Sequence, residues 1–288
     1  MRIGVVFPQT ELGGDPGAVR AYGERVEELG FTHVLAYDHV VGADPAVHQG
    51  WSGPYDIDTT FREPLVMFGY LAAVTTTLEL VTGVIILPQR QTVLVAKQAA
   101  EVDLLSGGRL RFGIGLGWNA VEYEALGQQF TNRGNRSEEQ LELLRLLWTQ
   151  RSVTFDGRYH QLTGAGIAPL PVQRPIPLWI GAAAARGYAR AGRLADGWFP
   201  MMQPGPALDE AKAVVDAAAR DAGRDPSQIG MEGRVSWQRD DDRVAAEIGG
   251  WADRGATHLS VNTMGAGLRT VDDHLSVLES VAVGAGLR

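Results

Sequence analysis

The most constraining feature of the sequence is a regular alternation between short runs rich in β-branched residues and longer segments of helical periodicity. Such alternation is typical of βα units, in which helices connect parallel strands and cover the sheet. Eight strands are predicted: Ile3–Phe7, His33–Tyr37, Leu78–Leu87, Leu110–Ile114, Leu178–Gly181, Gly197–Phe199, Met231–Trp237 and His258–Asn262. Eight units in 288 residues predict an α/β fold, a (β/α)8 TIM barrel, with residues 1–288 forming a single domain.

Insertions are predicted after strands 2 and 4 of this barrel. Residues 42–62 follow the second strand, and long loops of this kind are often lids over a site. Val153–Leu162, beyond the fourth strand and its helix, is expected to be a hairpin around Asp156-Gly157, a strong turn dipeptide. Residues 164–177, rich in Gly and Pro, return the chain to the fifth strand.

Helix ends also carry local signals. Asp15-Pro16 predicts an N-cap and first helical residue, and Gly107-Gly108 predicts the end of another helix, where a positive φ favours glycine. Ser137 followed by acidic residues matches a capping box, which predicts a helix start at this point.

Composition narrows the partners and the chemistry. The net charge of −8 and the pI of about 5.3 argue against nucleic acid and anionic membranes as partners. The chain has no cysteine, which excludes disulfides and thiolate chemistry, and its histidines show no metal-ligand spacing. We therefore expect an organic cofactor and no metal. Met1 leads directly into a strand without a signal peptide, so a cytoplasmic protein is expected.

The pair Asp38-His39 at the end of the second strand is the leading catalytic candidate. A histidine beside a carboxylate can act as acid or base near neutral pH. An arbitrary Asp-His pair more often caps a loop, but reactive groups of a (β/α)8 barrel lie at the carboxyl ends of its strands. That position favours the catalytic interpretation.

Three other strand ends could border a cofactor. Thr82, Gly83 and Val84 interrupt the third strand, and Gly115, Leu116, Gly117 and Trp118 end the fourth. Glycines let a ring or a phosphate approach the backbone, although a simple bulge explains them equally well. The fifth strand leads into Gly181, Ala182, Ala183, Ala184 and Arg186, where a helix N-terminus suits a phosphate, although alanines are also ordinary helix formers.

An apolar substrate wall is the weakest of these predictions, because aromatic and Met side chains are more often ordinary packing. Its members would be Phe7, Trp51, Tyr55, Trp198 and Met201.

Together these motifs resemble the luciferase-like monooxygenase superfamily, and within it the deazaflavin (F420)-dependent oxidoreductases. The resemblance covers nearly the whole chain. Its most specific parts are Asp38-His39, the run Asp103–Arg109, the following Gly113–Tyr123 and the run Leu194–Trp198.

The resemblance implies a cofactor across the strand ends, coenzyme F420 or alternatively FMN. It implies a cis peptide at Gly83-Val84 behind the ring, Asp38 at the ring's polar edge, and residues 115–118 along its border. It further implies that the amides of residues 181–184 hold the phosphate and that His39 lies near the reacting face. Relatives commonly form homodimers, so a homodimer is expected.

One departure from the family limits the substrate. In the family's sugar-phosphate dehydrogenases a catalytic Glu occupies the position of Trp118, which makes a sugar phosphate doubtful here. Glu122, one helical turn later, is expected to be structural, bonding Arg133, Arg136 or a backbone amide.

The resulting hypothesis is hydride transfer between F420 and an unidentified small, apolar organic substrate. The alternatives are an FMN-dependent monooxygenase supplied by a separate reductase, and a non-catalytic protein that only binds the cofactor.

Overall fold

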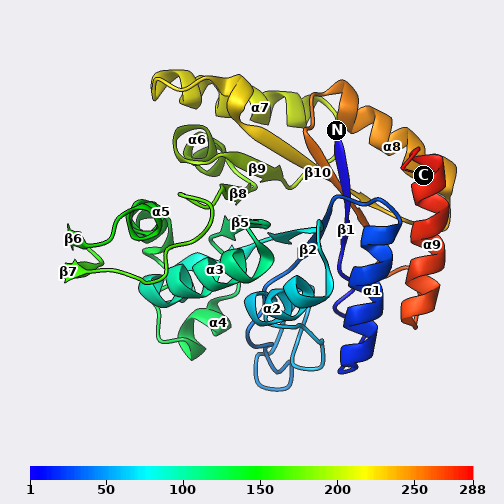
Figure 1. Cartoon of the computed structure of the whole chain (residues 1–288), viewed down its shortest axis with the longest axis horizontal. Coiled ribbons are helices and arrows are strands. Elements are labelled where there is room, and N and C mark those ends of the chain that lie inside the picture. Colours follow the sequence, from blue (N-terminus) through cyan, green and yellow to red (C-terminus); the bar gives the residue numbers. More distant parts are fainter. Residues whose placement is uncertain (288) are drawn as a thin grey trace.

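The computed structural model describes residues 1–287 and contains a closed barrel of eight parallel strands surrounded by helices (Figure 1). The barrel strands are β1 (Arg2–Val6), β2 (His33–Ala36), β3 (Glu79–Thr82), β5 (Leu110–Gly115), β8 (Leu178–Ala182), β9 (Gly197–Pro200), β10 (Gly230–Ser236) and β11 (His258–Asn262). Pairing of β1 with β11 and of β3 with β5 closes the ring. The predicted (β/α)8 barrel is confirmed.

The third strand differs from its prediction as one continuous run. It ends at Thr82, and the chain resumes as the short β4 (Ile85–Ile86), which pairs with β5 and leads into the turn η1 (Leu87–Gln89). The Gly83-Val84 peptide between the two pieces is cis, as the family resemblance implied.

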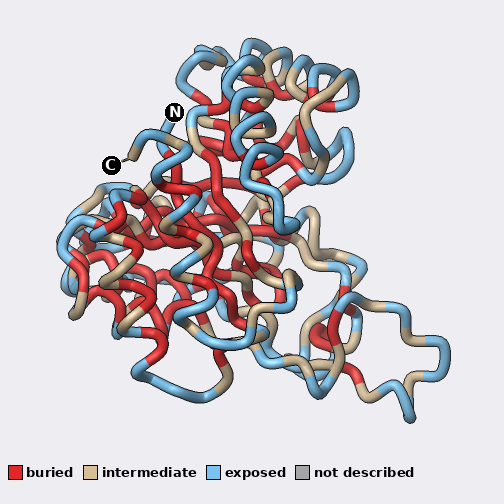
Figure 2. The backbone as a smooth tube through the Cα atoms, turned by 90° about the vertical axis from the view of Figure 1, so that its right-hand side faces the viewer, coloured by how far each residue is buried: buried red, intermediate tan, exposed pale blue. Residues whose placement is uncertain are grey.

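Helices cover the outside of the barrel, and buried residues are concentrated on the strands and the inner sides of these helices (Figure 2). The helices are α1 (Pro16–Glu28), α2 (Pro64–Val74), α3 (Thr92–Ser106), α4 (Ala120–Ala125), α5 (Arg133–Thr149), α6 (Ala185–Leu194), α7 (Pro206–Asp221), the turn η2 (Pro226–Gln228), α8 (Asp241–Asp253) and α9 (Val271–Gly284). Within residues 1–287, none of the helices has the length and apolar character needed to cross a membrane.

Two of the predicted helix ends are confirmed and one is wrong. Asp15 caps α1 by accepting from the amide of Gly17, and Gly107 ends α3 at a φ of 70°. The capping box at Ser137 is wrong, because α5 already begins at Arg133. The Ser137 hydroxyl instead donates to the carbonyl of Gly134, a back-bond available to serine inside a helix.

The predicted hairpin is confirmed as β6 (Val153–Asp156) and β7 (Gln161–Ala165), which stand apart from the barrel at the left edge of Figure 1. Residues 37–63 join β2 to α2 with neither helix nor strand, and residues 116–132, which include α4, join β5 to α5. Both long connections leave the carboxyl ends of barrel strands, where sites of such barrels lie.

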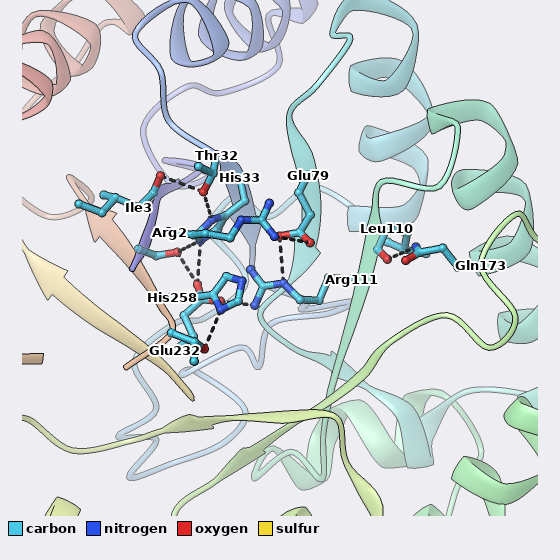
Figure 3. A network of polar contacts seen from close by, with 12 residues as sticks. Arg2, Ile3, Thr32, His33, Glu79, Leu110, Arg111, Gln173, Glu232 and His258 are labelled. Atoms are coloured by element: carbon cyan, nitrogen blue, oxygen red, sulfur yellow. Dashed lines mark hydrogen bonds and ion pairs between the residues drawn. The ribbon is translucent and has the colours of Figure 1, made fainter. Parts of the chain in front are cut away.

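The barrel interior is layered. Near the amino ends of the strands lies a polar network, drawn in Figure 3, in which the buried Glu232 carboxylate accepts from Ser260 Oγ at 2.6 Å. His33 Nε2 lies 3.1 Å from the same carboxylate, and Arg111 pairs with it and with Glu79.

Above the polar network lies an apolar cluster, separate from the main core between strands and helices. The buried members of this inner cluster are Val6, Leu35, Val81, Trp179 and Phe199, and the partly buried side chains against it are Tyr37, Val84 and Met264. The interior is thus a packed core up to the mouth, by which we mean the carboxyl ends of the strands.

Candidate active site

Asp38 lies two residues beyond the end of β2 and is 2% exposed. Its Oδ2 accepts from the amide of Ile86 at 2.9 Å, and its Oδ1 accepts from Arg90 Nη2 at 2.6 Å. Arg90 also pairs with Glu63 at 3.1 Å, at the start of α2. Asp38 therefore anchors the end of β2 to the turn after β4, and its negative charge is balanced by the partly buried Arg90.

His39 is held in a slot of rings and a carboxylate. Its ring lies against Tyr55, with centroids 3.7 Å apart, and meets Phe61 edge-on at 4.6 Å. Nδ1 lies 3.6 Å from Glu122 Oε1, too far for a hydrogen bond, and is enclosed without another hydrogen-bond partner in the described part of the chain. The side chain remains 18% exposed, so part of the ring is accessible.

Glu122, in the first turn of α4, joins this slot to the loop after β2. It is 1% exposed and accepts from the amide of Val40 at 2.7 Å and from the hydroxyl of Tyr55 at 3.1 Å. Burial acts to raise the pKa of Glu122, but neighbouring His39 and the Val40 amide favour the charged form more strongly, so the pKa lies below its ordinary value. Glu122 is therefore a carboxylate at neutral pH.

Of the three alternatives expected for Glu122, the structure selects the backbone amide. A backbone amide is indeed its partner, whereas neither Arg133 nor Arg136 bonds it. The guanidinium of Arg133 lies over Phe130 and donates to its carbonyl, and Arg136 donates to Gln128.

The lid candidate, residues 42–62, docks on the junction between β5 and α4 through aromatic side chains. Tyr55 accepts from Asn119 Nδ2 at 3.0 Å, and Trp51 Nε1 donates to the Tyr55 carbonyl at 2.9 Å. The ring of Trp118 lies 5.3 Å from Tyr55 and 5.7 Å from Trp51. Tyr55 and Trp51, predicted as substrate contacts, thus form with Trp118 and His39 one aromatic cluster beside the mouth.

The glycines after the strands allow an unusually close approach of Val84. A Cβ on Gly115 would lie 2.5 Å from Val84 Cγ2, and one on Gly181 would lie 3.2 Å from Cγ1. Gly117 has a φ of 67°, and a Cβ there would meet Ile86 at 2.6 Å. We call Val84, Gly115 and Gly181 the glycine cradle, in which the Val84 side chain lies where a side chain on either glycine would crowd it.

Two neighbours of the cradle have internal partners. Thr82 is fully buried, and its hydroxyl donates to the Gly113 carbonyl at 2.7 Å, so this side chain offers no free group to a ligand. The carbonyl of Leu116 accepts from Tyr123 Oη at 2.6 Å. These bonds support the backbone on which the cradle stands.

The N-terminus of α6 follows β8 directly and is open to solvent. No side chain caps it, and Ala183, Ala184 and Arg186 are exposed, while Ala182 is buried. Uncapped amides and the positive end of a helix dipole attract anions. This terminus could hold a phosphate, and Arg186 lies in its first turn.

Two predicted substrate contacts are wrong. Phe7 is fully buried against Tyr22 of α1, with ring centroids 5.2 Å apart, and Trp198 is buried against Tyr188 of α6 at 5.7 Å. Side chains alternate between the two faces of a strand, so both point outward to the helices. The inward-facing neighbour of Trp198 is Phe199.

Sequence reasoning also missed side chains at the inner wall of the mouth. Tyr37 and Met264 pack on the inner cluster, and Arg234 Nη1 donates to Tyr37 Oη at 2.9 Å. The two-residue alternation along β2 and β10 was the available signal for Tyr37 and Arg234. Met201, just after β9, is 59% exposed.

A separate hollow of about 830 Å³ lies between α5 and the β6–β7 hairpin, away from these groups. No cluster of three or more His, Asp or Glu side chains in residues 1–287 is arranged to hold a metal ion.

Comparison with known proteins identifies the family. A family model described as luciferase-like monooxygenase matches residues 1–272. An uncharacterized protein of Mycobacterium bovis is 30% identical over 290 residues, covering 98% of each chain. The F420-dependent glucose-6-phosphate dehydrogenase of Amycolatopsis mediterranei is 29% identical over 244 residues, covering 80% of this chain and 68% of that protein.

A solved structure with the same fold is the monooxygenase RslO1 from Streptomyces bottropensis. It superposes with a TM-score of 0.77 at 21% identity and covers 99% of this chain and 98% of its own. The family model matches most of the chain, and the barrel is the fold shared with the solved monooxygenase structure. The chain therefore belongs to the luciferase-like monooxygenase family.

Proposed function

We propose that this protein is a deazaflavin-dependent oxidoreductase that uses coenzyme F420 to transfer a hydride to or from a small organic substrate. The observation that carries the proposal is the glycine cradle between His39 and the uncapped N-terminus of α6. The similarity to an F420-dependent dehydrogenase supports this cofactor.

The residues present fit such a cofactor. Because Gly115 has no Cβ, the Val84 side chain can lie close to this strand end, and its surface suits a flat ring packed against it. The amides of residues 183–186 would hold the phosphate, with Arg186 adding a positive charge. When bound, the deazaflavin supplies a carbon that accepts or donates hydride. Asp38 fixes the turn behind the cradle through its bonds to Ile86 and Arg90.

His39 is the group that we propose to hold or move a proton. The carboxylate of Glu122 beside Nδ1 favours a proton on that nitrogen, which leaves Nε2 as the nitrogen that accepts or donates. Glu122 acts on the reaction only through His39 and the loop, so it is a positioning residue. The aromatic cluster holds the imidazole ring in place and limits the access of water to it.

The cofactor is tested by titrating the protein with F420 and, separately, with FMN while tryptophan fluorescence is followed. We expect micromolar or tighter binding of F420, about −8 kcal/mol, and weaker binding of FMN. In the Gly115→Leu variant the new side chain would collide with Val84 and displace it, which should weaken F420 binding. A clear preference for FMN would contradict the proposal.

The role of His39 is tested by His39→Ala. This variant should bind F420 nearly normally but lose turnover about 100- to 10,000-fold, the contribution typical of a positioned acid or base. Turnover is measured as the change in F420 absorbance with a panel of small alcohols, carbonyl compounds and carboxylates. Unchanged turnover would remove His39 from the mechanism.

A second candidate is an FMN-dependent monooxygenase that receives reduced flavin from a separate reductase. The structural similarity to a monooxygenase favours it only at the level of fold. Oxygen consumption with reduced FMN and a substrate, without F420 binding, would establish this alternative.

We also propose that the protein forms a homodimer through α2 and α3. Both helices are apolar on most sides, and their outer surfaces expose Val66, Tyr70, Leu94 and Leu105, each more than 40% accessible. Exposed apolar patches of this kind mark interfaces. Light scattering should give twice the chain mass, and Val66→Glu should shift it toward the monomer.

A further inference from the structure

We propose that Arg234 and Tyr37 form an anion-binding subsite at the inner wall of the barrel mouth, and that the substrate is a small, largely apolar molecule carrying a carboxylate. The second half of this statement rests on the proposed function, whereas the subsite itself does not. It also refines the earlier expectation of a purely apolar substrate.

The position of Arg234 follows from the alternation along β10. Arg234 is two residues beyond Glu232, whose side chain lies in the interior polar network, so both project from the same inner face of the strand. Arg234 is half-buried, and its guanidinium reaches across to β2. There Nη1 donates to Tyr37 Oη at 2.9 Å, and the guanidinium carbon lies 5.7 Å from the centre of the Tyr37 ring.

The charge of Arg234 is not balanced by a carboxylate. Within residues 1–287 no Asp or Glu oxygen lies within the 4.0 Å of an ion pair with it, in contrast to Arg90 and Arg111. None of its nitrogens belongs to the enclosed atoms that lack a partner, so its other N–H groups are reached by solvent. A solvent-accessible guanidinium fork matches the geometry of a carboxylate.

Tyr37 supplies a second donor. Its oxygen accepts from Arg234, and its own O–H has no acceptor among the residues that the structure describes. Burial raises the pKa of Tyr37, which keeps the phenol protonated at neutral pH despite the neighbouring arginine. The pair therefore presents a guanidinium N–H and a phenol O–H, one for each oxygen of a carboxylate.

The side chains around Arg234 and Tyr37 indicate the polarity of the rest of the ligand. Tyr37 packs on the inner cluster together with Val84 and Met264, so the wall beside the two donors is apolar. Glu232, two residues before Arg234 on the same face, acts electrostatically on Tyr37, but it pairs with Arg111 and not with Arg234. Asp38 and Glu122 are held by other groups and also form no ion pair with Arg234.

The test uses benzoate, which combines an apolar body with a carboxylate, and benzamide as its uncharged counterpart. Binding of each to the full-length chain is measured by calorimetry at low ionic strength, without cofactor and with F420. We expect benzoate to bind more tightly than benzamide. Arg234→Met should weaken benzoate binding about 10- to 100-fold, the loss expected for a charge-assisted hydrogen bond, and leave benzamide binding unchanged.

Further variants separate this role from others. Arg234→Lys should retain part of the benzoate affinity, which also guards against a folding defect of the Met variant, and Tyr37→Phe should weaken benzoate binding severalfold. Arg220→Met, an exposed change on the outer helix α7, is the matched control and should leave benzoate binding unchanged. Equal benzoate affinity in wild type and Arg234→Met would overturn the subsite.

The cofactor measurement distinguishes the two proposals. If Arg234→Met lost F420 affinity as strongly as benzoate affinity, Arg234 would be a cofactor contact and the inference would be wrong. If the wild type bound benzoate through Arg234 but bound no F420, the subsite would stand and the proposed function would fail.

Discussion

The two ends of the barrel interior differ in whether their charged side chains have partners within the protein. At the amino end the Glu232 carboxylate is bonded by Arg111, His33 and Ser260, although Arg111 Nη2 has no hydrogen-bond partner among the described residues. At the mouth His39 Nδ1 lacks a hydrogen bond, and Arg234 has no carboxylate partner. Both ends belong to the same ring of strands, so the difference lies in the side chains alone.

We therefore expect the amino end of the barrel to contribute to stability and the mouth to contribute to ligand binding. A buried charge network is sensitive to the loss of one member, because the remaining charges are then left without partners in a medium of low polarity. Groups that lack protein partners at a strand end can instead meet a ligand. Substitutions in the Glu232 network should therefore lower stability, whereas substitutions at the mouth should mainly change the loop beside it.

Glu232→Ala should give the largest loss of stability, about 3–5 kcal/mol, because it leaves the buried Arg111 with Glu79 as its one remaining carboxylate and removes the acceptor of His33 and Ser260. Chemical denaturation measures the change. Glu24→Ala, which removes an exposed pair with Arg20, should cost less than about 1 kcal/mol. A Glu232 variant as stable as the Glu24 variant would show that the network contributes nothing.

Glu122→Ala should have the next largest effect, about 1–3 kcal/mol, because the amide of Val40 and the hydroxyl of Tyr55 lose their acceptor. The loop of residues 42–62 should also become more sensitive to limited proteolysis. Glu124→Ala, an exposed change on the same helix, is the control. Identical cleavage rates in the three proteins would mean that Glu122 does not hold the loop.

Acid should destabilise the amino end progressively. Burial, aided by nearby Arg111, lowers the pKa of His258 from 6.5 to about 3. Between these values the unfolded chain binds a proton that the folded chain does not, so stability falls as pH falls from 6.5 toward 3, by at most about 1.4 kcal/mol per pH unit. The lowered pKa of Glu232 adds to this loss below pH 4.5.

Measurement between pH 6.5 and 5 isolates the histidine from the carboxylate, because Glu232 contributes mainly at lower pH. In this window His258→Gln should show a smaller slope of unfolding free energy against pH than the wild type. Equal slopes would exclude His258 as the source.

Strand positions and most helix ends were predictable because they depend on local chemistry. Asp15-Pro16 and Gly107 satisfy the backbone needs of a helix end wherever the helix packs. Ser137 failed because a serine hydroxyl can bond a helix carbonyl as readily as a free amide. The interruption at Gly83-Val84 came from the family resemblance and not from periodicity.

The face of the strand on which a side chain lies, and contacts between residues far apart in the sequence, were not predictable in the same way. Phe7 and Trp198 have the right composition for a substrate wall, yet a shift of one residue along a strand moves a side chain to the opposite face. The partner of His39 lies 83 positions along the chain, at Glu122, and no local pattern connects the two.

By itself, the sequence determined the barrel, the places where its strands end and the Asp38-His39 pair at one of those ends, because periodicity and turn chemistry act over a few residues. Only the tertiary structure decided that Glu122 faces His39 and that Arg234 meets Tyr37, 197 positions apart. The reason is that closure of the ring sets the register between strands, and the register decides which inward side chains become neighbours.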